Sequence, residues 1–123
     1  MPKKILIVED DSFLQGLAAG KLSKEGFQVL TASNGEDAVK IADSEHPDFI
    51  LLDLVLPTMD GFSVLEKIRS NASLAKTPVI VFSNLSEDAD IAKARELGAT
   101  DFMIKSNFTL DELALKIKTI LAI

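Results

Sequence analysis

A single charge, Asp53, interrupts the apolar stretch Phe49-Ile50-Leu51-Leu52-Asp53-Leu54-Val55-Leu56-Pro57. An apolar run of this length, with Asp48 before it and Pro57 at its end, indicates a strand buried on both faces. Asp is depleted in strands, and a carboxylate taken out of water destabilises the fold unless it stays near solvent or meets a cation. Asp53 is therefore either a cap for the loop after the strand or a residue with a function.

Five short apolar segments alternate with five amphipathic segments along the chain. The expected strands are Ile5–Val8, Gln28–Ala32, Phe49–Asp53, Val79–Phe82 and Asp101–Ile104. Parallel strands need crossover connections, and these are right-handed, so the alternation predicts an α/β fold with a doubly wound, five-stranded parallel sheet and five helices. Ligands of such sheets bind outside the carboxyl ends of the strands.

The expected first helix has apolar residues at helical spacing, namely Phe13, Leu14, Leu17, Ala18 and Leu22. Asp11 or Ser12 is its expected N-cap, and Gly26 stands where a left-handed residue ends a helix.

Cap and turn residues mark the other four helices. The second follows Asn34-Gly35 and ends before His46-Pro47, and the third follows Asp60-Gly61. The fourth is expected from Ser86-Glu87-Asp88 to Gly98, and the fifth opens with the capping-box pattern Thr109-Leu110-Asp111-Glu112. His46, the only histidine, is expected to be an exposed loop residue.

Composition narrows the class of protein. The chain has 123 residues, a formal net charge of −6 and no cysteine. This length fits a single domain, residues 1–123, and the acidic balance opposes binding to nucleic acid or anionic lipid. Without cysteine there is no thiol catalysis and no Cys-ligated zinc. The first residues contain neither a signal-peptide core nor a membrane span, so we expect a cytoplasmic location.

Polar residues end four of the five expected strands, and they are Glu9, Asp10, Asp53, Ser83 and Lys105. In a parallel sheet all of them fall on one edge. Two carboxylates about 4 Å apart repel by roughly 4 kcal/mol at an effective dielectric near 20, so such a cluster favours a hard divalent cation. Mg²⁺ prefers an octahedron of oxygen ligands and suits Asp10 and Asp53, and Mn²⁺ is a second candidate.

A metal held by these acids leaves one oxygen of Asp53 free to act as a nucleophile. The Lys105 ammonium and the Ser83 hydroxyl are suited to stabilise the charge of a phosphoryl group in transfer. Together the residue types point to phosphoryl transfer onto Asp53.

The chain resembles the receiver domain of two-component response regulators over essentially its whole length. The resemblance is carried by Ile5-Leu6-Ile7-Val8-Glu9-Asp10-Asp11, Leu52-Asp53-Leu54-Val55-Leu56-Pro57-Thr58-Met59-Asp60-Gly61, Pro78-Val79-Ile80-Val81-Phe82-Ser83, Gly98-Ala99-Thr100-Asp101-Phe102 and Lys105. It implies a flavodoxin-like sheet of strand order 2-1-3-4-5.

The resemblance also implies the roles of single residues. Asp53 would accept phosphate from a histidine kinase or phosphotransfer protein. The metal would be bound by Glu9, Asp10, Asp53 and the backbone carbonyl of Val55, and Ser83 and Lys105 would contact the phosphoryl group. An aromatic residue, here Phe102, would follow Ser83 inward and remodel the face of the fourth helix, fifth strand and fifth helix for an unknown downstream protein.

Two departures from the family concern residues near the expected phosphate. The family lysine is usually followed by proline in a cis peptide, whereas Ser106 follows Lys105 here, and a cis bond before serine costs about 3 to 4 kcal/mol. We therefore expect a trans peptide and a differently shaped loop. The aromatic position is commonly tyrosine, so Phe102 has no hydroxyl to offer a partner.

A third departure concerns the rate at which phosphate is lost. Asn84 is bulkier than the residues common after the family hydroxyl, and Val55 and Leu85 place apolar side chains beside the site. Because apolar flanks give no hydrogen bond that orients water, we predict slow dephosphorylation.

Three alternatives stay open. A phosphorylation-independent interaction module would keep the fold without the chemistry. A phosphatase of the haloacid dehalogenase type would need an Asp two positions after the nucleophile, where this chain has Val55. A flavin or nucleotide carrier lacks its glycine motifs. The sequence also leaves open a monomer or a phosphorylation-linked dimer, and a stand-alone receiver or a piece of a longer chain.

Overall fold

The structure is a computed structural model that describes residues 2–85 and 87–123. Its strands are β1 (Lys4–Val8), β2 (Gln28–Ala32), β3 (Phe49–Leu52), β4 (Val79–Ser83) and β5 (Asp101–Ile104). Its helices are α1 (Ser12–Lys24), α2 (Gly35–Glu45), α3 (Gly61–Ser70), α4 (Asp88–Glu96) and α5 (Leu110–Leu121), with short 3-10 helices η1 (Ala72–Leu74) and η2 (Lys105–Asn107). The predicted alternation of strands and helices is confirmed, with strand ends shifted by one residue.

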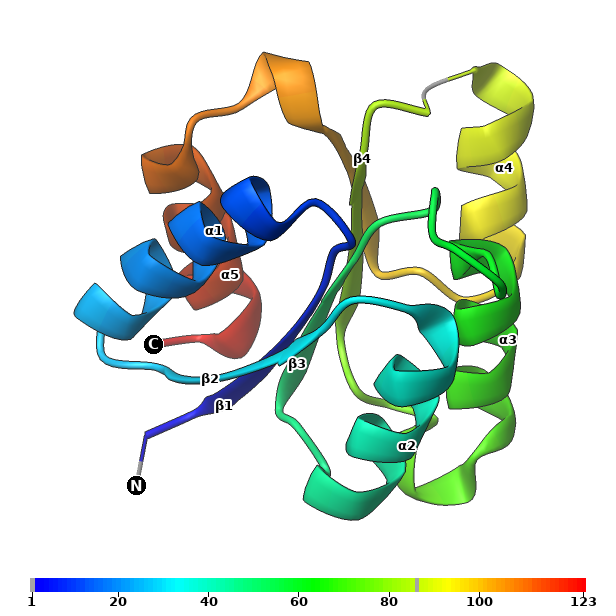
Figure 1. Cartoon of the computed structure of the whole chain (residues 1–123), viewed down its shortest axis with the longest axis horizontal. Coiled ribbons are helices and arrows are strands. Elements are labelled where there is room, and N and C mark those ends of the chain that lie inside the picture. Colours follow the sequence, from blue (N-terminus) through cyan, green and yellow to red (C-terminus); the bar gives the residue numbers. More distant parts are fainter. Residues whose placement is uncertain (1, 86) are drawn as a thin grey trace.

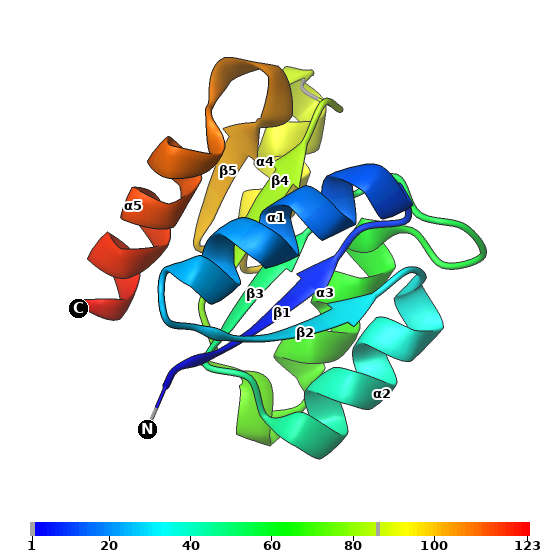
Figure 2. The same cartoon turned by 60° about the vertical axis from the view of Figure 1, so that its left-hand side comes forward.

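All strands are parallel, and their order is β2-β1-β3-β4-β5. The strand order expected from the resemblance is therefore confirmed. Figures 1 and 2 show the sheet between two helical layers, with α1 and α5 on one face and α2, α3 and α4 on the other. The strands run upward in Figure 1, and the carboxyl end of β4 lies near the top of the view.

Alternation along the central strands builds the two layers of the core. Ile5 and Ile7 of β1 pack in the layer under α1 and α5, whereas Leu6 and Val8 pack under α2 and α3. Every residue of β3 is buried, as expected for the central strand of a covered parallel sheet. Asp53 therefore follows a strand that is fixed on both faces.

Caps begin the helices where the sequence indicates them. Asp11 accepts hydrogen bonds from the backbone N–H groups of Phe13 and Leu14, and Thr109 forms the complete capping box. Gly26 has a positive φ of 94° and ends the first helical segment as predicted. Ser86, expected at the start of the fourth helix, lies outside the described residues. His46 is exposed, as predicted.

The apolar residues of α1 are only partly covered. Ala18 and Leu22 are buried, but Phe13, Leu14 and Leu17 are 72%, 41% and 44% exposed. The helix begins at the carboxyl edge of the sheet, where the strands end, so its first turns lie over the edge (Figure 2). Among the described residues, no helix combines the length and the apolar character that crossing a membrane requires.

Candidate functional site

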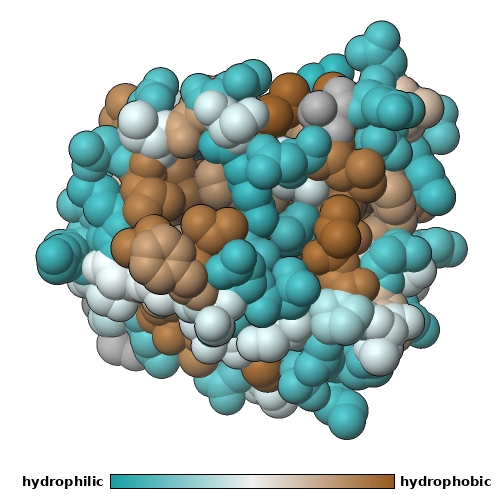
Figure 3. Space-filling model, turned by 45° about the horizontal axis from the view of Figure 1, so that its top comes forward, coloured by the Kyte–Doolittle hydropathy of each residue, from teal (hydrophilic) through white to brown (hydrophobic). Residues whose placement is uncertain are grey.

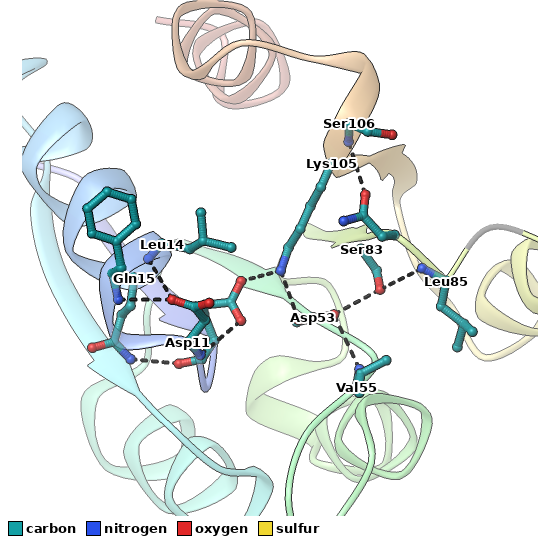
Figure 4. Close-up of polar contacts among 12 residues, drawn as sticks. Asp11, Leu14, Gln15, Asp53, Val55, Ser83, Leu85, Lys105 and Ser106 are labelled. Carbon is teal, nitrogen blue, oxygen red and sulfur yellow. Dashed lines mark hydrogen bonds and ion pairs between the residues drawn. The ribbon is translucent and has the colours of Figure 1, made fainter.

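The polar residues predicted at the strand ends meet at the carboxyl edge of the sheet. Glu9 and Asp10 follow β1, Asp53 follows β3, Ser83 ends β4 and Lys105 follows β5. Figure 4 shows Ser83 and Lys105 pointing toward Asp53 from the neighbouring strand ends. The predicted grouping is therefore present in the structure.

Asp53 is at the centre of this cluster and is only 7% exposed. Its Oδ1 accepts hydrogen bonds from the Ser83 hydroxyl at 2.8 Å and from the backbone N–H of Val55 at 3.2 Å. Its Oδ2 accepts from the Lys105 ammonium at 2.9 Å. Both carboxylate oxygens are thus bound by donors that would also suit a phosphoryl oxygen.

Lys105 is the cation of the cluster, and its ammonium contacts Glu9 as well as Asp53. Burial alone lowers the pKa of Lys105, but the hydrogen bonds from its ammonium to Glu9 and Asp53 outweigh burial and raise that pKa above its usual value. Burial raises the pKa of the Glu9 carboxyl, and the charge of Asp53 adds to the rise, against the opposing contact with Lys105. Both shifts have the sign expected where carboxylates outnumber cations.

The three acids form a suitable metal-binding group. One carboxylate oxygen from each of Glu9, Asp10 and Asp53 lies within 4.8 Å of the others, and only Asp10 is exposed. Oxygen donors at this spacing fit a hard divalent cation such as Mg²⁺. Val55, whose carbonyl was expected to complete the ligand set, follows Asp53 by two residues and contacts it through its own N–H.

The residues that flank the cluster differ in exposure. Val55 is 58% exposed and Leu85 is 38% exposed, so apolar side chains do line the rim. The Leu85 N–H donates to the Ser83 hydroxyl at 3.2 Å. No cis peptide occurs among the described residues, and the peptide between Lys105 and Ser106 is trans as predicted.

Phe102, the aromatic residue expected from the resemblance to follow Ser83 inward, packs in a small apolar cluster. Phe102 is half-buried and packs against Leu54, Val81 and Ala94, so it lies between β5 and α4. This position joins α4 to β5, two of the three elements in which a change was expected.

A cleft of about 320 Å³ opens beside the cluster. Asp53 and Lys105 line it together with Leu14, Leu17 and Phe108. Figure 3, turned to bring this edge forward, shows apolar patches on both sides of a polar band. The polar side chains of the cluster are thus flanked by apolar side chains in this cleft.

Sequence reasoning missed two residues that hold the site. Gln15 of α1 donates to the Glu9 carbonyl at 2.8 Å and to the Ala32 carbonyl at 3.3 Å, which fixes the chain after β1. A Cβ on Gly61 would lie 2.4 Å from the Asp53 carbonyl oxygen, so α3 begins against the backbone of the loop that carries Asp53. The Asp60-Gly61 pair indicated a turn in the sequence, but nothing in the sequence indicated that Gly61 contacts the backbone of Asp53.

The family model described as response regulator receiver domain matches residues 5–118. A Bacillus subtilis transcriptional regulatory protein for alkaline phosphatase synthesis is 38% identical over 121 residues, which are 98% of this chain and 49% of that protein. The chain spans about half the length of the curated relatives it matches.

Solved receiver domains have the same fold. The beryllofluoride-activated N-terminal receiver domain of Klebsiella pneumoniae RstA is 28% identical, with a TM-score of 0.87 over 95% of this chain and 97% of that one. The receiver domain of a Pseudomonas aeruginosa sensor histidine kinase is also 28% identical, with a TM-score of 0.88 over 97% of both chains. The latter has a magnesium ion coordinated in its active-site cleft.

Proposed function

This chain belongs to the response regulator receiver family, and from that premise we propose that it is a phosphorylation-dependent switch whose acceptor is Asp53. Receiver domains are in general phosphoacceptors rather than enzymes, and they interact with histidine kinases or phosphotransfer proteins. The observation that carries the proposal is the carboxylate of Asp53, buried at a strand end and bound by a hydroxyl, an ammonium and a backbone N–H.

In the proposed reaction, an oxygen of Asp53 attacks the phosphorus of a phosphohistidine. A P–O bond forms, the P–N bond breaks, and the histidine nitrogen leaves with the electron pair of that bond. Lys105 and Ser83, which already contact Asp53, then donate to the transferred phosphoryl oxygens. Glu9, Asp10, Asp53 and the Val55 carbonyl would hold Mg²⁺, which neutralises developing charge when bound.

The output of the switch would be a change at the face made by α4, β5 and α5. Phe102 packs between β5 and α4. If Ser83 moves toward the phosphoryl group, the side chain of Phe102 would move inward after it. A protein partner, or a second copy of the chain in a phosphorylation-linked dimer, would bind the changed face. The magnesium of the Pseudomonas receiver supports the metal assignment.

We propose that residues 1–123 form a single receiver domain and that it works in the cytoplasm.

The test is phosphorylation by a small donor. We expect one phosphoryl group on the wild-type protein after incubation with acetyl phosphate and Mg²⁺, measured by intact mass, and none on Asp53→Asn. Asp43→Asn is the matched control, since Asp43 is exposed on α2 and outside the acidic cluster.

The other outcomes separate the alternatives. A wild-type protein that takes up no phosphoryl group would favour an interaction module. Turnover of added phosphomonoesters would favour a phosphatase, and a group transferred equally to Asp53→Asn would place the acceptor elsewhere.

A further inference from the structure

The turn that carries Lys105 has few main-chain contacts of its own. Its closing hydrogen bond, from the Phe108 N–H to the Lys105 carbonyl, is 3.5 Å long and therefore weak. Within residues 2–85 and 87–123, one side chain bonds to the main chain of this turn: Oδ1 of Asn84 accepts from the Ser106 N–H at 3.0 Å.

Asn84 is attached to a well-fixed part of the molecule. It follows Ser83, which is fully buried and whose hydroxyl donates to Asp53. The register of β4 and β5 pairs Ser83 with Ile104, so Asn84 and Ser106 leave adjacent strand ends side by side. Their hydrogen bond joins the loop after β4 to the loop after β5 directly beside the acceptor.

The bond depends on the residue type at position 106. A proline there would have no N–H to donate and would restrict the backbone through its ring. Serine does not restrict the backbone in this way, and the side-chain amide of Asn84, which belongs to a different loop, restrains it by accepting the Ser106 N–H. The restrained peptide is the one that follows Lys105, whose flexible side chain reaches from this turn to Glu9 and Asp53.

We propose that Asn84 is a positioning residue that holds the Lys105 turn through its hydrogen bond to Ser106. This inference rests on the proposed function, because Lys105 acts there on the transferred phosphoryl group. A misplaced ammonium gives less stabilisation to the transition state, and the net value of one neutral hydrogen bond corresponds to a factor of about five.

The first experiment follows the rate of Asp53 phosphorylation by acetyl phosphate at several Mg²⁺ concentrations. We expect Asn84→Ala to lower the maximal rate, reached at saturating Mg²⁺, about five-fold. Ser106→Pro removes the N–H donor, so Asn84→Ala should cause no further loss of rate in a Ser106→Pro background. Asn107→Ala, the same type of change in the same turn, should keep the wild-type rate.

Two further measurements separate positioning from general destabilisation. In a Lys105→Met background, Asn84→Ala should have no effect on the remaining rate. Amide exchange at Ser106 should be about five-fold faster in Asn84→Ala, while exchange in β1 and β3 is unchanged. Asn84→Asp keeps an acceptor oxygen and should restore the protection of that amide.

Several outcomes would overturn the inference. These are a wild-type rate and wild-type Ser106 protection in Asn84→Ala, a further loss of rate in the Ser106→Pro background, or an equal loss in the Lys105→Met background. If the wild-type protein takes up no phosphoryl group, the proposed function fails and this inference with it. Normal wild-type phosphorylation with an unaffected Asn84→Ala overturns this inference alone.

Discussion

The loop after β3 and the loop after β5 hold their functional side chains in different ways. Asp53 continues a buried strand, its N–H donates to the Val8 carbonyl at 3.0 Å, and Gly61 packs against its carbonyl. Lys105 stands on an exposed turn attached mainly through Asn84. The Asp53 carboxylate is thus fixed by the core, whereas the Lys105 ammonium is held by a few polar contacts.

The largest effect on stability is expected from Gly61→Ala, which would disturb the loop that holds Asp53. A Cβ at position 61 would lie 2.4 Å from the Asp53 carbonyl oxygen and 2.5 Å from Cα of Leu54. Since both neighbours are backbone atoms, we expect a loss of about 3 kcal/mol, the upper end for overpacking, in urea unfolding.

Gly16→Ala is the control for that measurement. A Cβ on Gly16 meets no atom within 4 Å, and the residue lies inside α1. We expect this change to stabilise the protein by about 0.5 to 1 kcal/mol. Equal unfolding midpoints for the two variants would show that the loop that carries Asp53 is not held by the close approach of α3.

Lys105→Met should have the next largest effect. It leaves Glu9 and Asp53 without their cation, and removal of one partner of a buried pair costs about 3 to 5 kcal/mol when burial is complete. Because the Lys105 side chain is 13% exposed, we expect a smaller loss, about 2 kcal/mol, in metal-free buffer.

Added Mg²⁺ should restore part of this loss, since an ion that binds the folded state stabilises it. Unfolding in urea with and without Mg²⁺ measures both the loss of stability and its recovery. Lys118→Met, a change outside the acidic cluster, is the control. A variant as stable as the wild type in metal-free buffer would contradict the assignment of Lys105 as the balancing charge.

Val55→Asn is expected to change a rate and not the fold. Val55 and Leu85 are exposed beside Asp53, and neither side chain orients water. A polar group in their place should accelerate loss of phosphate from Asp53 about tenfold. The half-life of the phosphorylated protein, followed by intact mass, measures this. A wild-type half-life of seconds, unchanged by Val55→Asn or Leu85→Glu, would contradict the prediction.

The smallest effect is expected at the amino end of β5. Burial alone raises the pKa of Asp101, but the hydrogen bond from Lys116 and the Phe102 N–H outweigh burial and lower that pKa. A carboxyl with a lowered folded pKa adds stability above its unfolded pKa, and this stability is lost as the pH falls through the folded pKa.

Asp101→Asn should therefore be less stable than the wild type at neutral pH by less than about 1 kcal/mol, because the pair is partly exposed. The difference should vanish in acid. Denaturation at a series of pH values measures it, and phosphorylation should be unaffected. A change in phosphorylation rate would show that the strand, and not only its turn, sets the position of Lys105.

Much of the fold could be predicted because its signals are local. The period of the apolar residues gives the strands, and Asp11, Thr109 and Gly26 mark helix ends through bonds to near neighbours. The position of Asp53, Ser83 and Lys105 at one edge follows from parallel topology alone.

What could not be predicted depends on contacts between distant residues. Asn84 meets Ser106 across 22 positions, and Gln15 meets Ala32 across 17. The exposure of Phe13 could not be predicted either, because helical spacing does not show where a helix extends past the edge of its sheet.

The contact of the Lys105 ammonium with both Glu9 and Asp53 makes that ammonium a tethered competitor for any cation that enters. A charge held on the same chain is present at a high effective concentration, so an ion that binds weakly does not displace it. We therefore expect sodium and potassium ions to leave the Lys105 contacts in place. A divalent ion, with twice the charge and a need for several oxygens, can compete.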